Sequence, residues 1–376
     1  MARTLLRIKY RLQEDYFSML HFIGLGINGY KSVSIHVLEI LKNCDAIYLE
    51  RFSAFVSDGE LNGLRSLAEL HDFKMNILPA ERWFVEDGRD ILEQARTNDL
   101  ALLTYGDPFI ATTLIELYVR AIKNSIKVDV IHAASGITSL IGESGLHLYK
   151  FGRIITIMSE LQSTVSVYNT VYENLLAGNH TLILTEYNND HRKPFFLDPN
   201  SAFKALLQIE KDFRYKIFFK DTFAIVASRI GIPDQKIISG RVGSLRGINF
   251  GQGPHSIIVT GTLHFTEVEA LMTLTQSLDE PLDNTANMQN LSANMIARYV
   301  PKARQALSKI NHNSRKDNSK SGDRINFEVL DNAECYIDDA ERFLRQGKPE
   351  LAVLSIGYAE GLIDATSLKK GVDPWL

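Results

Sequence analysis

The chain has 376 residues, of which 45% are hydrophobic and 23% are charged, so it can bury a sizeable core and is long enough for two or three domains. Its formal net charge is only -4, from 41 Lys and Arg against 45 Asp and Glu, which disfavours nucleic acid and acidic membranes as partners. The two cysteines, Cys44 and Cys335, have no paired spacing, so they indicate neither a zinc motif nor a disulfide framework, and the cytoplasm is the expected location.

Residues 1–18 precede the first expected strand as an N-terminal extension. Arg3, Arg7 and Lys9 interrupt its apolar residues, so it lacks the continuous apolar core of an export signal. Because Met19 stands directly before the strand, we expect the extension to be either a peripheral helix or an artefact of start-codon choice. No window of the chain approaches the roughly 20 apolar residues that a membrane span requires, so we expect no membrane partner.

Residues 19–133 alternate strands with helices, which is the pattern of an α/β domain. The expected strands are apolar almost throughout, as is typical of one parallel sheet with helices on both faces. The strands are expected at 20–25, 45–50, 75–78, 100–104 and 128–133. The helices are expected at 33–42, 61–70, 91–96 and 111–123.

Residues 134–278 show a different pattern, with fewer helices between the strands. We therefore expect a second α/β domain built on a mixed sheet. Its strands are expected at 154–158, 181–186, 222–228, 235–240 and 256–260. Its helices are expected at 167–177, 200–213 and 266–276.

Residues 279–376 are expected to form a helical domain. The segment 278–287 at its start is polar and carries Pro281, which indicates a domain boundary. Apolar residues at three- and four-residue steps then predict helices at 288–310, 325–344 and 350–369. Residues 311–324 are too polar to pack and are expected to form a mobile linker.

The turn after the strand 100–104 is the first candidate ligand site. Gly106, Asp107 and Pro108 must turn the chain between this strand and the next helix. In an open α/β sheet, small molecules bind beyond the carboxyl ends of the strands, where backbone amides and helix starts are free to meet polar atoms. An ordinary strand-to-helix turn would use the same residues, because Gly-Asp-Pro is also good turn chemistry.

A glycine motif after the first strand suggests a second ligand site. Gly24, Gly26 and Gly29 have the spacing of a dinucleotide-binding loop, and Glu50 stands where a ribose-binding acid is expected. Three such glycines also arise by chance, and residues 30–32 separate the third from its helix, so a nicotinamide enzyme is disfavoured. Phosphate-loop and nucleophile-elbow patterns are absent, and the histidines form no ligand cluster, so we expect no metal site.

A family resemblance rests on six short motifs: Phe22-Ile-Gly-Leu-Gly26, Gly106-Asp-Pro-Phe-Ile-Ala-Thr-Thr113, Ile131-His-Ala-Ala-Ser135, Gly145-Leu-His-Leu-Tyr-Lys-Phe-Gly152, His180-Thr-Leu182 and Gly253-Pro-His-Ser-Ile-Ile-Val-Thr-Gly-Thr-Leu-His264. Together they resemble the diphthine synthases, which belong to the tetrapyrrole methylase-like class of S-adenosylmethionine-dependent methyltransferases. The motifs follow one another in consistent order over about residues 19–276. The resemblance implies a two-domain tetrapyrrole methylase-like α/β fold with a parallel first sheet and a mixed second sheet, here followed by an all-α domain.

The resemblance also implies a cofactor and a substrate. The cofactor would be S-adenosylmethionine, held in a folded shape between the two α/β domains and not on a glycine-rich loop. The substrate would be the histidine of elongation factor 2 that carries a 3-amino-3-carboxypropyl group, and methylation of its amino nitrogen would give diphthine; a homodimer is also implied. The matching motif positions imply cofactor contacts at Ile27, Asp107, Ile110, Ser135, Gly136, Thr185, Ser228 and His255.

The roles of these residues are only partly defined by the sequence, and no general base can be named. His255 could be a base or a hydrogen-bond partner of the cofactor, and the second role is favoured. Asp107 is expected to face the polar or cationic part of the cofactor. Two departures from the family pattern, the segment 31–35 and Tyr105 before Gly106, are expected to alter how the protein substrate docks.

Three other functions are compatible with the sequence. A tetrapyrrole (precorrin) methyltransferase would share the fold, whereas a ribosomal RNA methyltransferase would need a basic docking face that the net charge does not favour. A cofactor-sensing scaffold without enzymatic activity could use the helical tail as its binding module. The tail itself resembles an archaeal helical family of unknown function, which favours an archaeal source.

Overall fold

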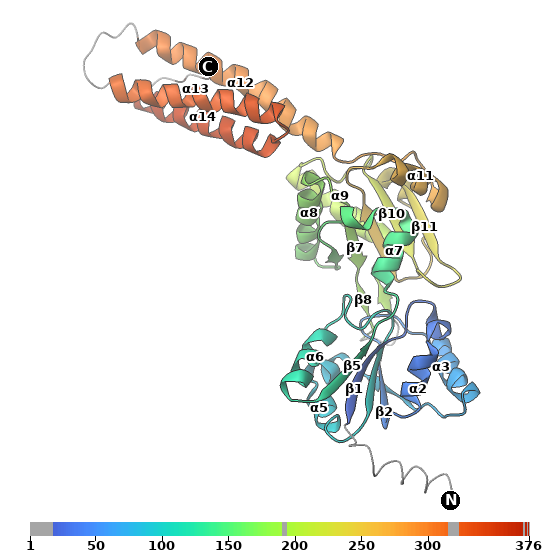
Figure 1. The fold of residues 1–376 in the computed structure, drawn as a ribbon. Helices are drawn as coiled ribbons and strands as arrows, with labels where there is room; N and C mark the ends of the chain where they lie inside the picture. Colours follow the sequence, from blue (N-terminus) through green and yellow to red (C-terminus); the bar gives the residue numbers. More distant parts are fainter. Residues whose placement is uncertain (1–17, 190–193, 315–322, 371–372, 374, 376) are drawn as a thin grey trace, which may run out of the picture. The chain divides into compact units, whose positions relative to one another are not determined.

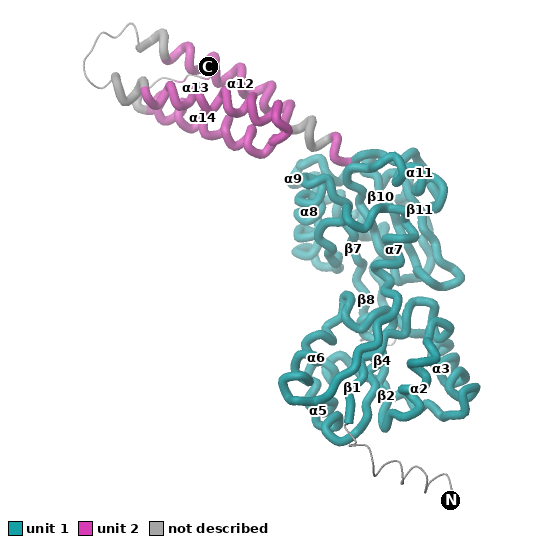
Figure 2. Tube along the Cα trace, in the orientation of Figure 1, with its two compact units in different colours: residues 1–283 teal, residues 284–376 magenta. Residues whose placement is uncertain are grey.

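The computed structural model describes residues 18–189, 194–314, 323–370, 373 and 375. The chain divides into two compact units, residues 1–283 and residues 284–376, which Figure 2 draws in different colours. The sequence analysis places the start of the helical domain at residue 279. Of the predicted N-terminal extension, only Ser18 belongs to the described residues, and its hydroxyl donates to Arg96 O at 2.7 Å.

A five-stranded sheet forms the first half of unit 1, and it is parallel throughout, as predicted. The strand order is β3-β2-β4-β1-β5, so β4 is the middle strand and pairs with β1 and β2 on its two sides (Figure 1). Parallel pairing brings the carboxyl ends of all five strands to one edge, where their loops can build a binding site. The strands are β1 (Met19–Gly24), β2 (Ala46–Glu50), β3 (Ile77–Ala80), β4 (Leu100–Thr104) and β5 (Lys127–Ile131).

Helices cover both faces of this sheet because its central strands are apolar on both sides. Leu100 and Leu102 pack with Phe22 on one face, whereas Leu103 packs with Ile23 on the other. All five residues of β4 are buried, which explains why this strand reads as a continuous apolar run. The helices are α2 (Ile35–Leu41), α3 (Asp58–Leu70), α4 (Arg82–Asp87), α5 (Arg89–Gln94) and α6 (Leu114–Lys123), with a 3-10 turn η1 (Gly29–Ser32).

The sequence prediction misses α4 and starts α6 three residues too early. α4 has only six residues, and its Trp83 is exposed, so the helix is too short for an apolar period to be recognised. Gly88 separates α4 from α5 in the left-handed region, at φ 60°, where glycine is favoured. α6 begins at Leu114 because residues 108–113 form turns at the carboxyl edge of the sheet.

A six-stranded mixed sheet forms the second half of unit 1, in the order β13-β11-β10-β12-β7-β6. The pairs β10–β11, β10–β12 and β12–β7 are antiparallel, and β6–β7 and β11–β13 are parallel, which confirms the predicted mixed sheet. Its strands are β6 (Ile155–Ile157), β7 (Thr181–Thr185), β10 (Phe223–Ser228), β11 (Lys236–Arg241), β12 (His255–Val259) and β13 (Gln276–Ser277). Its helices are α7 (Gly136–Ser144), α8 (Leu161–Leu176), α9 (Pro199–Phe213), α10 (Val242–Leu245) and α11 (Phe265–Leu274), with a 3-10 turn η2 (Leu148–Lys150).

The sequence prediction lacks several elements of this half, of which one helix and one hairpin concern the candidate site. α7 follows directly on the turn at residue 135, and Leu140 from this helix joins the buried core of the second sheet. A small antiparallel hairpin of β8 (Tyr187–Asn188) and β9 (Phe195–Phe196) leaves the sheet after β7. Both elements reach the candidate site, so their omission affects the functional prediction.

Three long helices form unit 2: α12 (Ala286–Ser314), α13 (Asp323–Arg345) and α14 (Pro349–Lys370). Alanine and isoleucine side chains dominate their shared core, including Ala303, Ile337, Ala340 and Ile363. The helical domain is therefore confirmed, but the predicted linker 311–324 is too long. α12 continues through residue 314 and α13 starts at residue 323, and residues 315–322 lie outside the described part of the chain.

α14 is more apolar than the sequence analysis expects. Among the described helices, it alone has the length and composition of a membrane span, over Pro349–Leu368. Leucine, isoleucine and valine residues spread along the segment give it this hydropathy without a continuous apolar block. Ala352, Ile356 and Ala359 from this helix are buried in the three-helix core, so packing within unit 2 uses one side of it.

Candidate active site

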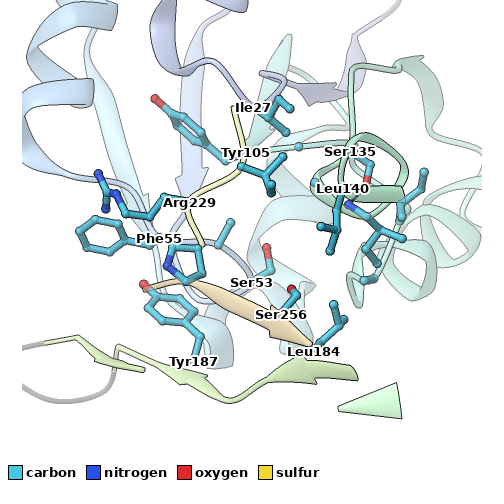
Figure 3. Close-up of a pocket in the computed structure, with 18 of the residues that line it drawn as sticks. Ile27, Ser53, Phe55, Tyr105, Ser135, Leu140, Leu184, Tyr187, Arg229 and Ser256 are labelled. Atoms are coloured by element: carbon cyan, nitrogen blue, oxygen red, sulfur yellow. Dashed lines mark hydrogen bonds between the residues drawn. The ribbon is translucent and has the colours of Figure 1, made fainter. Parts of the chain in front are cut away.

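A cavity of about 340 Å³ lies in unit 1, at the carboxyl edge of the first sheet. Loops after β1, β2, β4 and β5 line it from one side, and β7, the β8–β9 hairpin, the loop after β10 and the start of β12 line it from the other (Figure 3). Seven of the eight expected cofactor positions line this cavity. They are Ile27, Asp107, Ile110, Ser135, Gly136, Thr185 and His255.

The eighth expected position, Ser228, does not line the cavity. Antiparallel pairing sets Ser228 directly opposite His255, and the Ser228 hydroxyl lies 2.9 Å from His255 Nδ1. Ser228 is buried, whereas its neighbours Ala227 and Arg229 reach the lining. A direct cofactor contact is therefore not supported for Ser228, which lies beside His255 on the neighbouring strand.

The glycines after β1 serve close packing of two loops. Gly26 and Gly106 exchange two backbone hydrogen bonds, with N–O distances of 3.2 and 2.9 Å. A Cβ on Gly24 would lie only 2.6 Å from the Gly106 oxygen, so only glycine fits there. Gly29 in turn lies against the Glu60 carboxylate. These contacts explain the glycine spacing without a dinucleotide.

Glu50 is also occupied by its own chain. Its carboxylate is buried and accepts hydrogen bonds from the backbone N–H groups of Phe52 and Ser53, at 3.1 and 3.0 Å. The hydroxyls of Ser53 and Thr104 donate to its other oxygen. Because four donors already satisfy the carboxylate, Glu50 shapes the loop after β2 and is not positioned to hold a ribose.

Asp107 is held in place by three groups of the protein. Its Oδ1 accepts the Phe109 N–H at 2.9 Å, and its Oδ2 lies 2.8 Å from His132 Nδ1 and 3.3 Å from the Ala133 nitrogen. The side chain is buried, yet the residue belongs to the cavity lining. An ionised carboxylate has about four acceptor positions, so one remains for a ligand.

Ser135 and Gly136 start α7 at the cavity wall. The Ser135 hydroxyl accepts the Ile137 N–H at 3.2 Å and thereby caps the helix. No atom lies within 4 Å of a Cβ built on Gly136, nor on Gly106, and both glycines line the cavity. Glycine at these two positions therefore keeps space free in front of the backbone.

His255 is a neutral, oriented side chain on the cavity wall. Burial lowers the pKa of its imidazole, with a weaker opposing effect of Asp198. Ser228 fixes the Nδ1 side of the ring, and the Thr185 hydroxyl donates to the His255 backbone oxygen at 2.8 Å. These contacts hold β7, β10 and β12 together where they meet the cavity.

Several lining residues are absent from the sequence prediction. Glu60 Oε2 accepts the Tyr30 N–H at 2.8 Å and the Tyr105 hydroxyl at 3.2 Å, and burial together with Glu60 raises the pKa of Tyr105. Phe55 and Tyr187 also reach the lining, one from each half of unit 1. The only available signal was position, because the loop after β2 emerges at the same sheet edge as Asp107.

A second polar network lies in the other half, built from the motifs around residues 145–152 and 253–264. The Glu267 carboxylate is fully buried and accepts the backbone N–H groups of His147 and His264, at 2.9 and 2.8 Å. Lys150 donates to it, and His180 Nε2 lies 3.0 Å away. Burial alone would raise the pKa of Glu267, but these donors outweigh it and lower the pKa to about 2.

His180 completes this network as a neutral ring. Its Nδ1 accepts the Gly261 N–H at 2.8 Å, so the proton resides on Nε2, which donates to Glu267. Burial lowers the pKa of His180 despite the adjacent carboxylate. None of the residues in this network lines the cavity, so the network stabilises the fold.

Comparison with known proteins agrees with this architecture. Residues 19–246 match the family model described as Tetrapyrrole (Corrin/Porphyrin) Methylases. The chain is 36% identical to a diphthine methyl ester synthase of Dictyostelium discoideum, over 67% of this chain and 96% of the relative. It is 34% identical to a diphthine synthase of Methanocaldococcus jannaschii, over 69% of this chain and 100% of the relative. The chain belongs to the diphthine synthases of the tetrapyrrole methylase family.

Membership of this family confirms both the predicted fold and the methyltransferase function in diphthamide biosynthesis. A solved diphthine synthase structure superposes with a TM-score of 0.60 at 26% identity and covers 73% of this chain and 100% of that one. Residues 298–368 match a protein family of unknown function, DUF357. The relatives of this chain include proteins of both archaea and eukaryotes.

Proposed function

We propose that the enzyme uses S-adenosylmethionine to methylate the amino nitrogen of the 3-amino-3-carboxypropyl histidine of elongation factor 2, giving diphthine. The observation that carries this proposal is the cavity at the carboxyl edge of the first sheet, which gathers seven of the eight expected cofactor positions. The names of the relatives, diphthine synthase and diphthine methyl ester synthase, supply the substrate class.

The lining residues fit a cofactor of this kind. A volume of about 340 Å³ lies within the usual range for small-molecule sites. The space in front of Gly106 and Gly136 admits a ligand close to the backbone, and the carboxylates of Asp107 and Glu60 suit a cationic one. Ile27 and Ile110 add apolar surface to the same lining.

Catalysis of this reaction depends mainly on how the enzyme positions the substrate amine relative to the methyl group of the cofactor. When bound, S-adenosylmethionine supplies a methyl group on a positively charged sulfur, and an uncharged amine can displace it in line. Holding nitrogen, carbon and sulfur collinear can contribute about 7–11 kcal/mol. His255 can serve as a neutral hydrogen-bond partner, because its lowered pKa keeps it uncharged beside a cationic ligand. The amine must lose its proton before it attacks, to water or to a base on the lining.

Intact-mass measurement of elongation factor 2 after reaction tests the proposal. We expect S-adenosylmethionine and the full-length enzyme to add fixed methyl increments to elongation factor 2 that carries the modified histidine. Elongation factor 2 with an unmodified histidine is the matched control and should gain none. The number of increments also shows whether methylation stops at the amine or extends to the carboxylate. Absence of any increment on the modified substrate would refute the proposal.

A second candidate is a precorrin methyltransferase, favoured only by the match to the tetrapyrrole methylase family model. Incubation with radiolabelled S-adenosylmethionine and a precorrin, in parallel with modified elongation factor 2, separates the two functions. We also propose a homodimer in the cytoplasm, as the family resemblance implies. Light scattering on the purified enzyme measures the oligomeric state.

A further inference from the structure

Three aromatic rings meet beside the cavity, contributed by both halves of unit 1. Phe55 follows β2, whereas Tyr187 and Phe196 pair across the β8–β9 hairpin. The rings of Tyr187 and Phe196 stack at a centroid distance of 5.2 Å, and Phe55 stands edge-on to both, at 6.4 and 5.5 Å. Phe55 and Tyr187 line the cavity, and we call this pair the aromatic wall (Figure 3).

The aromatic wall is held rigidly before any ligand binds. The Tyr187 hydroxyl donates to Arg51 O at 2.9 Å, and burial raises the pKa of Tyr187 to about 12, so the ring stays neutral. A Cβ on Gly253 would lie 2.4 Å from Phe196 Cγ, which shows that this ring packs directly against the backbone. Phe196 in turn supports Tyr187 from behind. Little ordering entropy is therefore lost when a ligand meets the wall.

The charges around the cavity permit a cationic ligand. The carboxylates of Glu60 and Asp107 belong to the lining. Arg229 is the only Lys or Arg side chain among the described lining residues, and its Nε donates to Asp234 at 2.8 Å, which partly offsets its charge. In Figure 3 the aromatic wall lies on one side of the view and Ser135, before α7, on the other.

The chemistry of successive methylation matches such a wall. Each added methyl group removes an N–H donor from the amine, so a carboxylate or carbonyl partner holds the nitrogen less well after every step. Aromatic faces attract a cation without needing a donor, and they are the usual recognition element for quaternary ammonium groups. They also stabilise positive charge that develops on the nitrogen as the methyl group is transferred.

From these observations, and resting on the proposed function, we infer that Phe55 and Tyr187 receive the methylated ammonium group of the substrate. The substrate nitrogen gains one methyl group in each transfer, and the aromatic wall binds it more tightly the more methyl groups it carries. Removal of one ring is expected to weaken binding of a trimethylammonium group about 2- to 30-fold, the range that cation–π interactions cover.

A pair of isosteric probes tests the wall without any methyl transfer. The first probe is N,N,N-trimethyl-2-aminobutyrate, which reproduces the methylated head group, and the second replaces its nitrogen with carbon and is 2-tert-butylbutanoate. Calorimetry with the full-length enzyme should show tighter binding of the trimethylammonium probe. We call it the charged probe, because its head group is charged, although both probes carry a carboxylate. In Phe55→Leu and Tyr187→Leu this preference should fall about 2- to 30-fold. Equal affinity of the wild-type enzyme for both probes would overturn the inference.

Two further variants separate the aromatic face from structural effects. Tyr187→Phe keeps the ring and loses only the hydrogen bond to Arg51, so it should retain the preference for the charged probe. Phe195→Leu alters the residue next to Phe196 in β9, whose side chain points to the opposite side of the hairpin, and should also retain it. A loss in Tyr187→Phe, or an equal loss in Phe195→Leu, would contradict a role for the ring face.

Product analysis connects the wall to turnover and keeps the two proposals apart. With modified elongation factor 2, Phe55→Leu and Tyr187→Leu should accumulate partly methylated product, because the last transfer slows most. A wild-type product distribution in both variants would overturn the inference while the proposed function stands. A wild-type enzyme that prefers the charged probe but methylates no elongation factor 2 would instead refute the proposed function.

Discussion

Two buried polar regions of unit 1 use charge in different ways. In the network around Glu267, backbone N–H groups, a lysine and a histidine use both carboxylate oxygens, and none of these residues lines the cavity. At the cavity, Asp107 and His255 are each held by protein groups on one side and belong to the lining on the other. The first arrangement is closed and stabilises the fold, whereas the second keeps capacity for a ligand.

Removal of Glu267 should have the largest effect on stability. Glu267→Ala leaves Lys150 and His180 without their partner in a buried site, which is expected to lower the free energy of unfolding by about 3–5 kcal/mol. Glu269→Ala, an exposed carboxylate on the same helix, is the matched control and should change it by less than about 0.5 kcal/mol. Denaturant unfolding measures both. Similar losses in the two variants would show that the closed network contributes no special stability.

Asp107→Asn tests whether the Asp107 carboxylate contacts a ligand in the cavity. The variant loses a charge that a cationic cofactor would meet, so its affinity for S-adenosylmethionine should fall about 10- to 100-fold, as expected for a hydrogen bond to a charged group. Titration calorimetry measures the affinity. An unchanged affinity together with a large loss of stability would place Asp107 with Glu267, as a charge that only holds the loop.

The sequence predicts the strands and the sheet edge that carries the cavity better than the side-chain contacts around the cavity. Apolar runs such as β4 define the strands, and the carboxyl ends of parallel strands then bring Ile27, Asp107 and Ser135 to one edge. The position of Ser228 depends on strand register, which the sequence does not contain. The aromatic wall depends on how the β8–β9 hairpin approaches the loop after β2, and no local pattern encodes that contact.

The pH dependence of stability should separate the two buried histidines, His180 and His255, from the Glu267 carboxylate. Burial lowers the pKa of His180 and His255, so the unfolded chain binds protons more readily than the native one below about pH 6.5. Stability should therefore fall as the pH drops from 6.5, by at most about 1.4 kcal/mol per histidine at pH 5.5. Glu267, with its pKa lowered to about 2, loses its contribution only between pH 4.5 and 2. Thermal unfolding across this range measures the profile.

A variant at His255 identifies how much of the pH dependence of stability comes from this cavity residue. His255→Asn removes one of the two buried rings, so its unfolding temperature should depend less steeply on pH between 6.5 and 5.5. The step between pH 4.5 and 2 belongs to Glu267 and should remain. A profile with the slope of the wild-type enzyme would mean that His255 titrates as it does in the unfolded chain.

The smallest effect is expected at Ser228, which contacts His255 but does not line the cavity. Ser228→Ala leaves His255 Nδ1 without its partner, so the ring is less firmly oriented and the affinity for S-adenosylmethionine should fall about 2- to 10-fold. Ser239→Ala is the matched control, because Ser239 is equally buried and its hydroxyl lies 2.6 Å from Thr275 Oγ1, away from the cavity lining. Both variants should lose a similar amount of stability, but only Ser228→Ala should lose affinity. If the two variants lose affinity equally, orientation of His255 does not contribute to binding. The hydrogen bond of Ser228 to His255 then has no more effect on the cavity than the hydrogen bond of Ser239 to Thr275.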